Sequence, residues 1–333
     1  MTGGRWRKPT PPVSFQQMPS SNAAGAGDPA RAPEQRIPAF VNPLSPNGST
    51  VRDALAGNDA FESHDLDPRT LRMQIAEAVA AGAPRVLVAG GDGTLGTAAA
   101  ALVNQPTELA VIAAGTLNHF ARDHGIPEEC DDAIATALNA SAGPVDVGLV
   151  SDNVFLNTAS VGMYVAYVRT RERLEKYFGY RFASAIAFLI TFIRFKRVSV
   201  ELNVDGEQRH YRTALLFVGV GERELKAPHF GNRIPGGHRG LHVMVLRGRR
   251  PARVLTMALA AATRGIREVA ASPELDSFLV DSCAVTVGRR RHVTIGLDGE
   301  LIRLNTPLRF ELLRDKLQVA GATRPADQPG EEE

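Results

Sequence analysis

The chain has 333 residues, of which 44% are hydrophobic and 22% charged, and its formal net charge is +2. This composition allows a substantial core, excludes disorder of the whole chain and gives no electrostatic case for a nucleic-acid partner. The length favours two domains, and the two cysteines, Cys130 and Cys283, lack the spacing of a zinc or redox site. No apolar stretch reaches the ~20 residues that span a bilayer, so we expect a soluble cytoplasmic protein.

The two ends of the chain are expected to lie outside the fold. Residues 1–36 hold six prolines among Gly, Ser, Ala and Gln, without apolar periodicity. Ordering them would cost entropy that no burial offsets, and they lack the apolar run of a secretory signal. We therefore expect a disordered leader at 1–36 and, by the same argument, a disordered acidic tail at 322–333.

Residues 37–144 alternate short apolar strands with helices. Strands are predicted at 38–41, 85–89 and 109–113, and helices at 71–81 and 98–103. Strands that are apolar on both faces and alternate with helices are typical of a parallel sheet covered by helices. We predict a three-layer α/β nucleotide-binding domain with a mainly parallel sheet over 37–144.

After Pro144 the apolar residues alternate with a period of two. Strands are predicted at 145–150, 198–204, 211–220, 241–246, 282–287, 292–297 and 308–313. Asp205-Gly206 between two of them is a typical hairpin turn. We predict an all-β domain, an antiparallel β-sandwich over 145–321, interrupted by one helix at 169–197.

The segment 86–94 carries the strongest chemical signal. A buried strand ends in Gly90, Gly91, Asp92, Gly93 and Thr94, and a helix follows. The backbone N–H groups at the start of a helix stabilise phosphate, and glycine lets the backbone approach it closely. An aspartate at this position would repel phosphate unless a divalent cation lay between them, which indicates a Mg²⁺-nucleotide. The alternative is a tight strand-to-helix turn without a ligand.

Two further loops follow predicted strands. Gly115, Thr116 and Asn118 come after one strand, and Asn42 to Ser45 come after another. Ligands of open α/β sheets bind at the carboxyl ends of the strands, so these loops could frame one crevice. Helix capping by Thr116 or Asn118 and an ordinary Asn-Pro turn are the alternatives. Neither a GxxxxGK[ST] loop nor a GxGxxG fingerprint is present.

Five segments in this order resemble the soluble bacterial diacylglycerol kinase-like lipid kinases, which are related to sphingosine kinases and NAD kinases. The segments are Asn42-Pro-x-Ser45, Gly90-Gly-Asp-Gly-Thr-Leu95, Gly115-Thr-Leu-Asn-His-Phe-Ala-Arg122, Pro144-Val-Asp-Val-Gly148 and Leu297-Asp-Gly-Glu300. The resemblance covers residues 37–321. It implies ATP and Mg²⁺ as cofactors and Asp298 as the catalytic base, with Asp92 beside it. The implied nucleotide contacts are Asn42, Ser45, Gly90, Gly91, Asp92, Gly93, Thr94, Leu95, Gly96, Thr116, Asn118 and Glu300.

The role of Asp298 requires the second domain to fold back over the nucleotide crevice. Phosphoryl transfer needs a carboxylate that accepts the proton of the attacking hydroxyl. The residues alone do not select Asp298, because residues 205–207 form an identical Asp-Gly-Glu tripeptide and either could be a hairpin turn. We therefore expect the site at the interface of the two domains.

Three departures from the family pattern stand out. Gly96-Thr97 replaces a usual Asn-Glu, and Pro46 replaces a usual glycine. His238 and His242 stand in the segment where carboxylates of the family often bind a structural Mg²⁺, and imidazole is a poor ligand for that ion. We predict no structural metal site, while the ATP-bound Mg²⁺ remains. The two histidines could form a transition-metal pair, but we expect exposed loop histidines.

The predicted helix at 169–197 combines basic residues with an apolar stretch. Such a helix can rest on an anionic bilayer surface, or it can simply cover the sandwich. The resulting hypothesis is a kinase that transfers the γ-phosphate of Mg-ATP to the hydroxyl of diacylglycerol or a related lipid. It would work in the cytoplasm, with peripheral contact at the inner face of the plasma membrane, and the sequence is compatible with a homodimer. The alternatives are an NAD kinase and a catalytically inactive nucleotide sensor.

Overall fold

The computed structural model describes residues 36–322 apart from 194–196, 205, 225–231, 235, 248–255, 257–259 and 261–273. In one helix it leaves out the side chains of residues 180, 181, 185, 188, 192 and 193. The predicted leader and acidic tail lie outside the described residues, except for their innermost positions. The predicted turn at Asp205 lies outside them as well.

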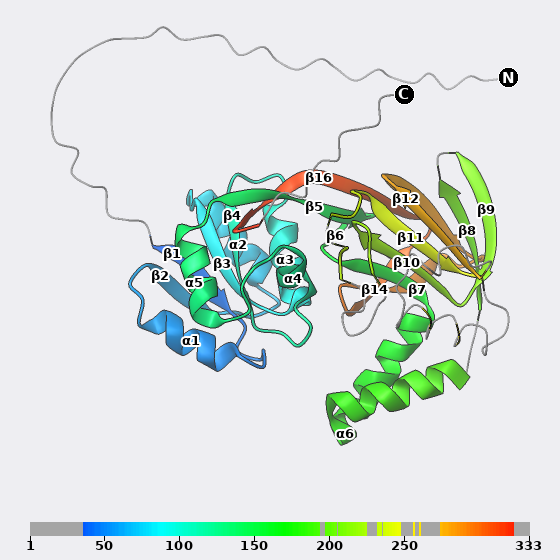
Figure 1. The fold of residues 1–333 in the computed structure, drawn as a ribbon, viewed down its shortest axis with the longest axis horizontal. Coiled ribbons are helices and arrows are strands. Elements are labelled where there is room, and N and C mark those ends of the chain that lie inside the picture. The colour runs from blue at the N-terminus through cyan, green and yellow to red at the C-terminus, as the bar shows by residue number, and fades with distance from the viewer. Residues whose placement is uncertain are drawn as a thin grey trace, which may run out of the picture. The chain divides into compact units, whose positions relative to one another are not determined.

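The N-terminal part is a parallel sheet with helices on both faces (Figure 1). Its strands run in the order β2-β1-β3-β4, and all three pairings are parallel. The strands are β1 (Ile37–Val41), β2 (Phe61–Asp65), β3 (Arg85–Gly90) and β4 (Glu108–Ala113). The helices are α1 (Gly48–Ala56), α2 (Leu71–Ala80), α3 (Asp92–Leu102), α4 (His119–Asp123) and α5 (Cys130–Asn139).

The burial of β3 explains the three layers. Val86 and Val88 face one core, which also contains side chains of α2 and α3. Leu87 and Ala89 face a second core, which contains side chains of α1 and α5. Because successive side chains of a strand point to opposite faces, an uninterrupted apolar strand requires helices on both sides.

The same sheet continues into the C-terminal part. β16 (Leu308–Ala320) pairs in parallel with β4 near its end and antiparallel with β5 (Ala142–Val150) and β13 (Ser282–Val287). Ten strands therefore form one sheet, and Figure 1 shows β16 connecting the two parts. The remaining strands are β6 (Asn153–Phe155), β8 (Val198–Val204) and β9 (Glu207–Thr213). The domain boundary after residue 144 stays a prediction.

A second, six-stranded sheet packs against the antiparallel half of the first. Its order is β12-β11-β10-β7-β14-β15, and every pairing is antiparallel. A single core holds side chains of both sheets, including Val218 and Ile295 from one and Val285 and Phe310 from the other. The strands are β7 (Thr158–Gly162), β10 (Leu215–Val220), β11 (Leu241–Leu246), β12 (Leu275–Val280), β14 (His292–Leu297) and β15 (Glu300–Asn305). The predicted fold class, α/β followed by an antiparallel β part, is confirmed.

Two predicted elements were wrong in detail. The strand expected at 211–220 is two strands in different sheets, and the Thr213 hydroxyl bonds the backbone N–H and C=O of Leu215 where the chain passes from one sheet to the other. The helix expected at 169–197 is α6 (Met163–Ile193), which bends at Gly179 (φ 68°, ψ 165°) into the two arms seen in Figure 1. Left-handed backbone of this kind suits glycine. No helix within the described residues is both long and apolar enough to cross a bilayer.

Candidate active site

The start of α3 has no side-chain cap. Its N-cap, Gly91, has extended backbone (φ −88°, ψ 178°), and no side chain caps the helix. The N–H groups of the first helical turn have no partner within the helix, and the helix dipole places partial positive charge there. Phosphate fits such a helix start.

Two glycines bring the second loop against this helix start. A Cβ atom on Gly115 would lie 2.5 Å from the Cα atom of Gly91, which no real side chain tolerates. Asn118 has left-handed backbone (φ 51°), and its Oδ1 accepts the N–H of Gly115 at 2.9 Å. The loops after β3 and β4 therefore lie in direct backbone contact.

The carboxylate of Asp92 ties three elements together. It accepts the backbone N–H groups of His119 (3.2 Å) and Phe120 (3.0 Å) at the start of α4. It also accepts the Nδ2–H of Asn157, 3.1 Å away, in the connection between β6 and β7. Asp92 therefore joins the α/β part to the antiparallel part.

Asp298, in the turn between β14 and β15, reaches the same place. Its carboxylate accepts the backbone N–H groups of Leu156 at 2.6 Å and of Asn157 and Thr158 at 2.8 Å each. Its own N–H donates to the carbonyl of Thr158 at 2.9 Å, and its φ is 45°. Five polar contacts therefore link Asp92 and Asp298 to residues 156–158, and Asn157 touches both carboxylates.

The pKa of Asp298 is raised to about 6: burial is the largest cause, the three backbone hydrogen bonds act to lower it, and the nearby charge of Asp92 also acts to raise it. The carboxylate forms no ion pair with any described residue. A half-buried carboxylate that has no cation partner among the described residues and is held by neutral donors can change its protonation state near neutral pH.

The β14–β15 turn faces the first turns of α3. A Cβ atom on Gly96 would lie 3.4 Å from Oδ2 of Asp298, and one on Gly93 would lie 2.5 Å from Oε1 of Glu300. Glycine at these helical positions therefore leaves room for the two carboxylates. The structure brings Asp298 and Glu300 next to the first turns of α3.

The other predicted contact residues have different surroundings. Asn42 donates from Nδ2 to Oγ1 of Thr94 at 3.2 Å, which ties the first loop to α3. Ser45 lies in that loop, where its N–H donates to the carbonyl of Asn42. Thr116 is exposed. Leu95 is a correction: its side chain is buried in the core, and its N–H donates to Gly91, so it is not available to a nucleotide.

Asn157 was missed by the sequence analysis. It is 3% exposed, and its Oδ1 has no hydrogen-bond partner among the described residues. No sequence signal identified it, because it lies in a short turn whose neighbours, β6 and β7, were not predicted. His119, whose Nδ1 lies 2.6 Å from Oδ1 of Asn232, was within a quoted segment but received no role.

A cluster of ion pairs lies in the segment where the family often has its structural metal. Arg239 donates from Nε to Asp146 at 2.8 Å and from Nη2 to Asp315 at 2.9 Å. The second buried pair joins Arg223 to Asp123. Burial opposes the ionised form of Asp146, yet hydrogen bonds from Arg239 and from the N–H of Asp315 lower its pKa below the ordinary value. We call Asp123, Asp146, Arg223, Arg233 and Arg239 the arginine–carboxylate cluster.

The prediction for the two histidines was half right. His238 is exposed, but His242 is buried and its Nδ1 accepts the N–H of Arg223 at 2.9 Å. Its Nε2, 2.8 Å from Oγ of Ser277, must therefore carry the proton and donate. Burial lowers the pKa of His242 to about 4, so it is neutral at pH 7. Within the described residues, no group of three or more His, Cys, Asp or Glu side chains could hold a metal ion.

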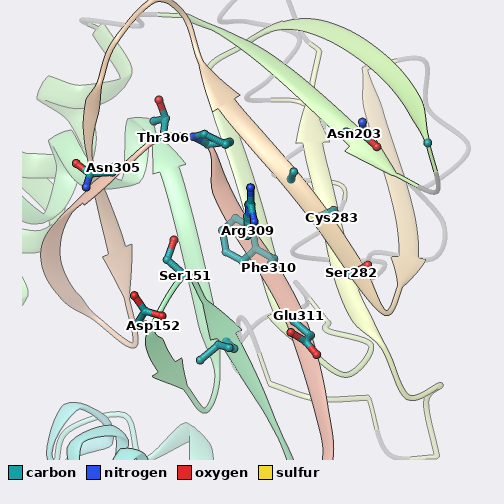
Figure 2. Close-up of a pocket in the computed structure, with 14 residues that line it drawn as sticks. Ser151, Asp152, Asn203, Ser282, Cys283, Asn305, Thr306, Arg309, Phe310 and Glu311 are labelled. Carbon is teal, nitrogen blue, oxygen red and sulfur yellow. The ribbon is translucent and has the colours of Figure 1, made fainter. Parts of the chain in front are cut away.

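One hollow of about 790 Å³ lies away from all of these residues. Figure 2 shows it beside β16, with Arg309 and Glu311 projecting from that strand and Asp152 from the turn between β5 and β6. None of the predicted contact residues lines it.

Comparison with known proteins shows what the N-terminal part of this site is similar to. The family model described as diacylglycerol kinase catalytic domain matches residues 37–150. Residues 37–150 are therefore similar to a diacylglycerol kinase catalytic domain. The matched segment includes β3, α3 and β4, and hence Asp92 and both glycine loops, while Asp298 lies beyond it. The resemblance inferred from the five segments is confirmed.

Bacterial proteins are similar to this chain over part of their length. "Probable lipid kinase YegS-like" from Pseudomonas putida is 38% identical over 44% of this chain and 50% of its own. A protein of the same name from Pseudomonas savastanoi is 33% identical over 56% of this chain and 60% of its own. The chain thus matches about half of each curated relative. A diacylglycerol kinase from Bacillus anthracis shares the fold, with a TM-score of 0.61 and 19% identity over 86% of this chain and 96% of its own.

Proposed function

We propose that this protein is an ATP-dependent lipid kinase that transfers the γ-phosphate of Mg-ATP to the hydroxyl of diacylglycerol or a related lipid. The observation that carries the proposal is the pair of contacts from Asn157 to Asp92 and Asp298. Through these two contacts the carboxylate of Asp298, which belongs to the antiparallel part, lies beside the start of α3, where we place the phosphates of the nucleotide.

The residues present fit a magnesium-bound nucleotide. The uncapped first turn of α3 offers N–H groups to phosphate oxygens, and the contact between Gly91 and Gly115 leaves the backbone accessible there. Mg²⁺ is usually held by one or two carboxylates together with substrate phosphates. Asp92 and Glu300 are the carboxylates closest to the helix start that could take this role. The metal would supply charge neutralisation of the phosphates.

Asp298 is the proposed general base. With a pKa of about 6 it is mostly ionised at pH 7 and remains basic enough to accept the proton of a hydroxyl. The three backbone N–H groups hold its two oxygens in a fixed orientation without neutralising their charge. Positioning a base in this way contributes roughly 10²–10⁴-fold to the rate of a reaction.

The acceptor is proposed from the kinase domain and from the names of its relatives. A diacylglycerol kinase catalytic domain and relatives named for lipid kinases favour a lipid hydroxyl. An NAD kinase and an inactive nucleotide sensor remain the two alternatives. Gly96-Thr97, where the family usually has Asn-Glu, motivates the inactive alternative.

The test is phosphate transfer from γ-labelled ATP to diacylglycerol, other lipid alcohols and NAD in mixed micelles. We expect a labelled lipid, and we expect Asp298→Asn to lower kcat by roughly 10²–10⁴-fold, since it removes the base and keeps the shape. ATP binding and thermal melting of the variant are measured in parallel as controls for folding. Labelled NAD would favour the NAD kinase, and ATP binding without any labelled product would favour the sensor.

We further propose that α6 contacts an anionic membrane surface from the cytoplasmic side. Phe182, Ile186 and Leu189 follow one another at helical spacing and are 73%, 36% and 58% exposed. The basic Arg173 and Lys176 are exposed in the preceding arm. Apolar side chains beside basic ones suit an interfacial helix. Sedimentation with phosphatidylglycerol vesicles should fall in Phe182→Ser and should persist if α6 plays no part. The homodimer stays a prediction.

A further inference from the structure

The guanidinium of Arg239 lies between two carboxylates from different strands. Its Nε donates to Oδ2 of Asp146 on β5 at 2.8 Å, and its Nη2 donates to Oδ1 of the same carboxylate. Nη2 also donates to Oδ1 of Asp315 on β16 at 2.9 Å. The planar fork of arginine matches a carboxylate in this two-bonded way. A single cationic group therefore joins β5 to β16.

The backbone of β16 is irregular where it supplies the second carboxylate. The register of β16 against β5 shifts between Leu313 and Leu317, and Asp315, inside this shift, has a φ of 55°. Left-handed backbone is uncommon for residues other than glycine and persists where surrounding contacts hold it. Here the N–H of Asp315 donates to Oδ1 of Asp146 at 3.0 Å, and its carboxylate accepts from Arg239. The strand is thus shaped around the guanidinium.

The segment 237–242 does not fit the structural Mg²⁺ that the family often binds there. It contains no carboxylate. The buried His242 has no lone pair left for a metal, because its Nδ1 accepts the N–H of Arg223 and its Nε2 carries the proton that it donates to Ser277. The side chain of this segment that reaches Asp146 is itself a cation, Arg239.

The arginine–carboxylate cluster and Asp315 together balance in charge without a metal. Their three carboxylates each accept a hydrogen bond from an arginine side chain of the cluster. Their three guanidinium groups belong to Arg223, Arg233 and Arg239. The pKa of the adjacent His124 is lowered to about 3, chiefly by burial and then by the charges of Arg233 and Arg223. These surroundings oppose one more positive charge, and a divalent cation would add two.

We propose that the guanidinium of Arg239 is a built-in structural cation, which does for Asp146 and Asp315 what a bound divalent metal would otherwise do. It neutralises both carboxylates and holds β5 against β16, so the fold needs no metal at this position. Removal of the guanidinium should leave a place that an added cation can fill. The proposal does not depend on phosphoryl transfer, since stability is measured without ATP or lipid.

The test is thermal melting of the whole protein and of Arg239→Ala in excess EDTA, or with low millimolar guanidinium, Ca²⁺ or urea. Urea has nearly the shape of guanidinium without its charge, and Ca²⁺ accepts carboxylate ligands in flexible geometry. EDTA should leave the melting temperature of the unmodified protein unchanged. Arg239→Ala should melt roughly 10 °C lower. Guanidinium and Ca²⁺ should restore part of this loss, and urea should restore none.

The matched control is Arg314→Ala, which removes the base of the surface pair with Asp281, whose side chains are 42% and 68% exposed. It should melt close to the unmodified protein and gain nothing from either cation. The EDTA measurement on the unmodified protein needs no variant, so it tests the proposal even if Arg239→Ala does not fold. A lower melting temperature of the unmodified protein in EDTA would overturn the proposal. So would an Arg239→Ala protein that gains no more from guanidinium and Ca²⁺ than from urea, or no more than Arg314→Ala gains.

Discussion

Two aspartates of the antiparallel part are held in opposite ways. Among the described residues, the side chain of Asp298 receives hydrogen bonds only from backbone N–H groups, and its pKa is raised to about 6, chiefly by burial. Asp146 is paired with the guanidinium of Arg239 and also accepts the N–H of Asp315, and its pKa is lowered despite burial. The donors therefore decide which carboxylate can change its protonation state.

The difference separates a chemical role from a structural one. Neutral amides orient the oxygens of Asp298 but leave its negative charge uncompensated, which is what a base needs. In the arginine–carboxylate cluster, guanidinium groups compensate the charges of Asp146 and Asp123 and join α4 to residues of the antiparallel part. The cluster is suited to holding the structure together, and Asp298 is suited to proton transfer.

The largest loss of stability should come from breaking the arginine–carboxylate cluster. Asp146→Asn removes the carboxylate that pairs with the largely buried Arg239, while Asp315, which also accepts from Arg239, has a side chain that is 34% exposed. Removing one partner of a buried ion pair typically costs about 3–5 kcal/mol, so we expect a loss of about that size in the free energy of unfolding. Urea denaturation followed by circular dichroism measures it.

The matched control is Asp281→Asn, which removes the acid of a surface pair with Arg314. Its side chains are 68% and 42% exposed, so the loss should be below about 1 kcal/mol. Similar losses in the two variants would mean that the cluster contributes no more than an ordinary surface pair.

The fold of residues 37–144 could largely be predicted from the sequence, because most of its strands have a clear local pattern. Residues 85–90 are apolar on both faces and end in glycines, so the strand, its burial and the loop after it follow from local chemistry. β2, by contrast, has the sequence Phe-Glu-Ser-His-Asp and buries only Phe61, which gives no strand signal. α3 was expected to begin near residue 98, because Asp92, Gly93 and Gly96 are weak helix formers.

The partners of Asp298 could not be predicted from local patterns. They are backbone N–H groups of residues 156–158, about 140 positions away in the chain, and any residue other than proline provides such a group. The arginine–carboxylate cluster was missed for a related reason. Arg239 and Asp146 are 93 positions apart, and an arginine in a loop is usually solvated.

A smaller effect concerns the pH dependence of stability. Because the folded protein raises the pKa of Asp298 above the ordinary value of 3.8 to about 6, the folded state binds this proton more tightly than the unfolded state. Binding of this proton therefore stabilises the folded state below pH 4, and the stabilisation, of up to about 3 kcal/mol in the free energy of unfolding, is lost as the pH rises through 6. Asp298→Asn should remove this decline in urea titrations at pH 4, 5, 6 and 7.

Asp146 should act with the opposite sign. Its pKa is lowered, so its stabilisation is present above pH 4 and is lost as the pH falls through the folded value. If Asp298→Asn and the unmodified protein lose stability in parallel between pH 4 and 6, the raised pKa of Asp298 is not real, and its assignment as the base loses its main electrostatic support.

The smallest change in stability is expected for Gly96→Ala. This variant fills space next to Asp298 without disturbing the fold. A Cβ atom on Gly96 would lie 3.4 Å from Oδ2 of Asp298, which is an ordinary contact, and alanine favours a helix interior over glycine. Gly96→Ala should therefore raise the free energy of unfolding by about 0.5–1 kcal/mol.

The same methyl group would occupy space next to the proposed base, where the acceptor hydroxyl must approach. We expect kcat/KM for the lipid to fall while ATP affinity, measured by titration, stays the same. Since a misplacement of about 1 Å can cost 10²-fold, the fall should be clear even though the protein is more stable. Unchanged kcat/KM in a stabilised Gly96→Ala protein would mean that the hydroxyl does not approach Asp298 from the side of α3.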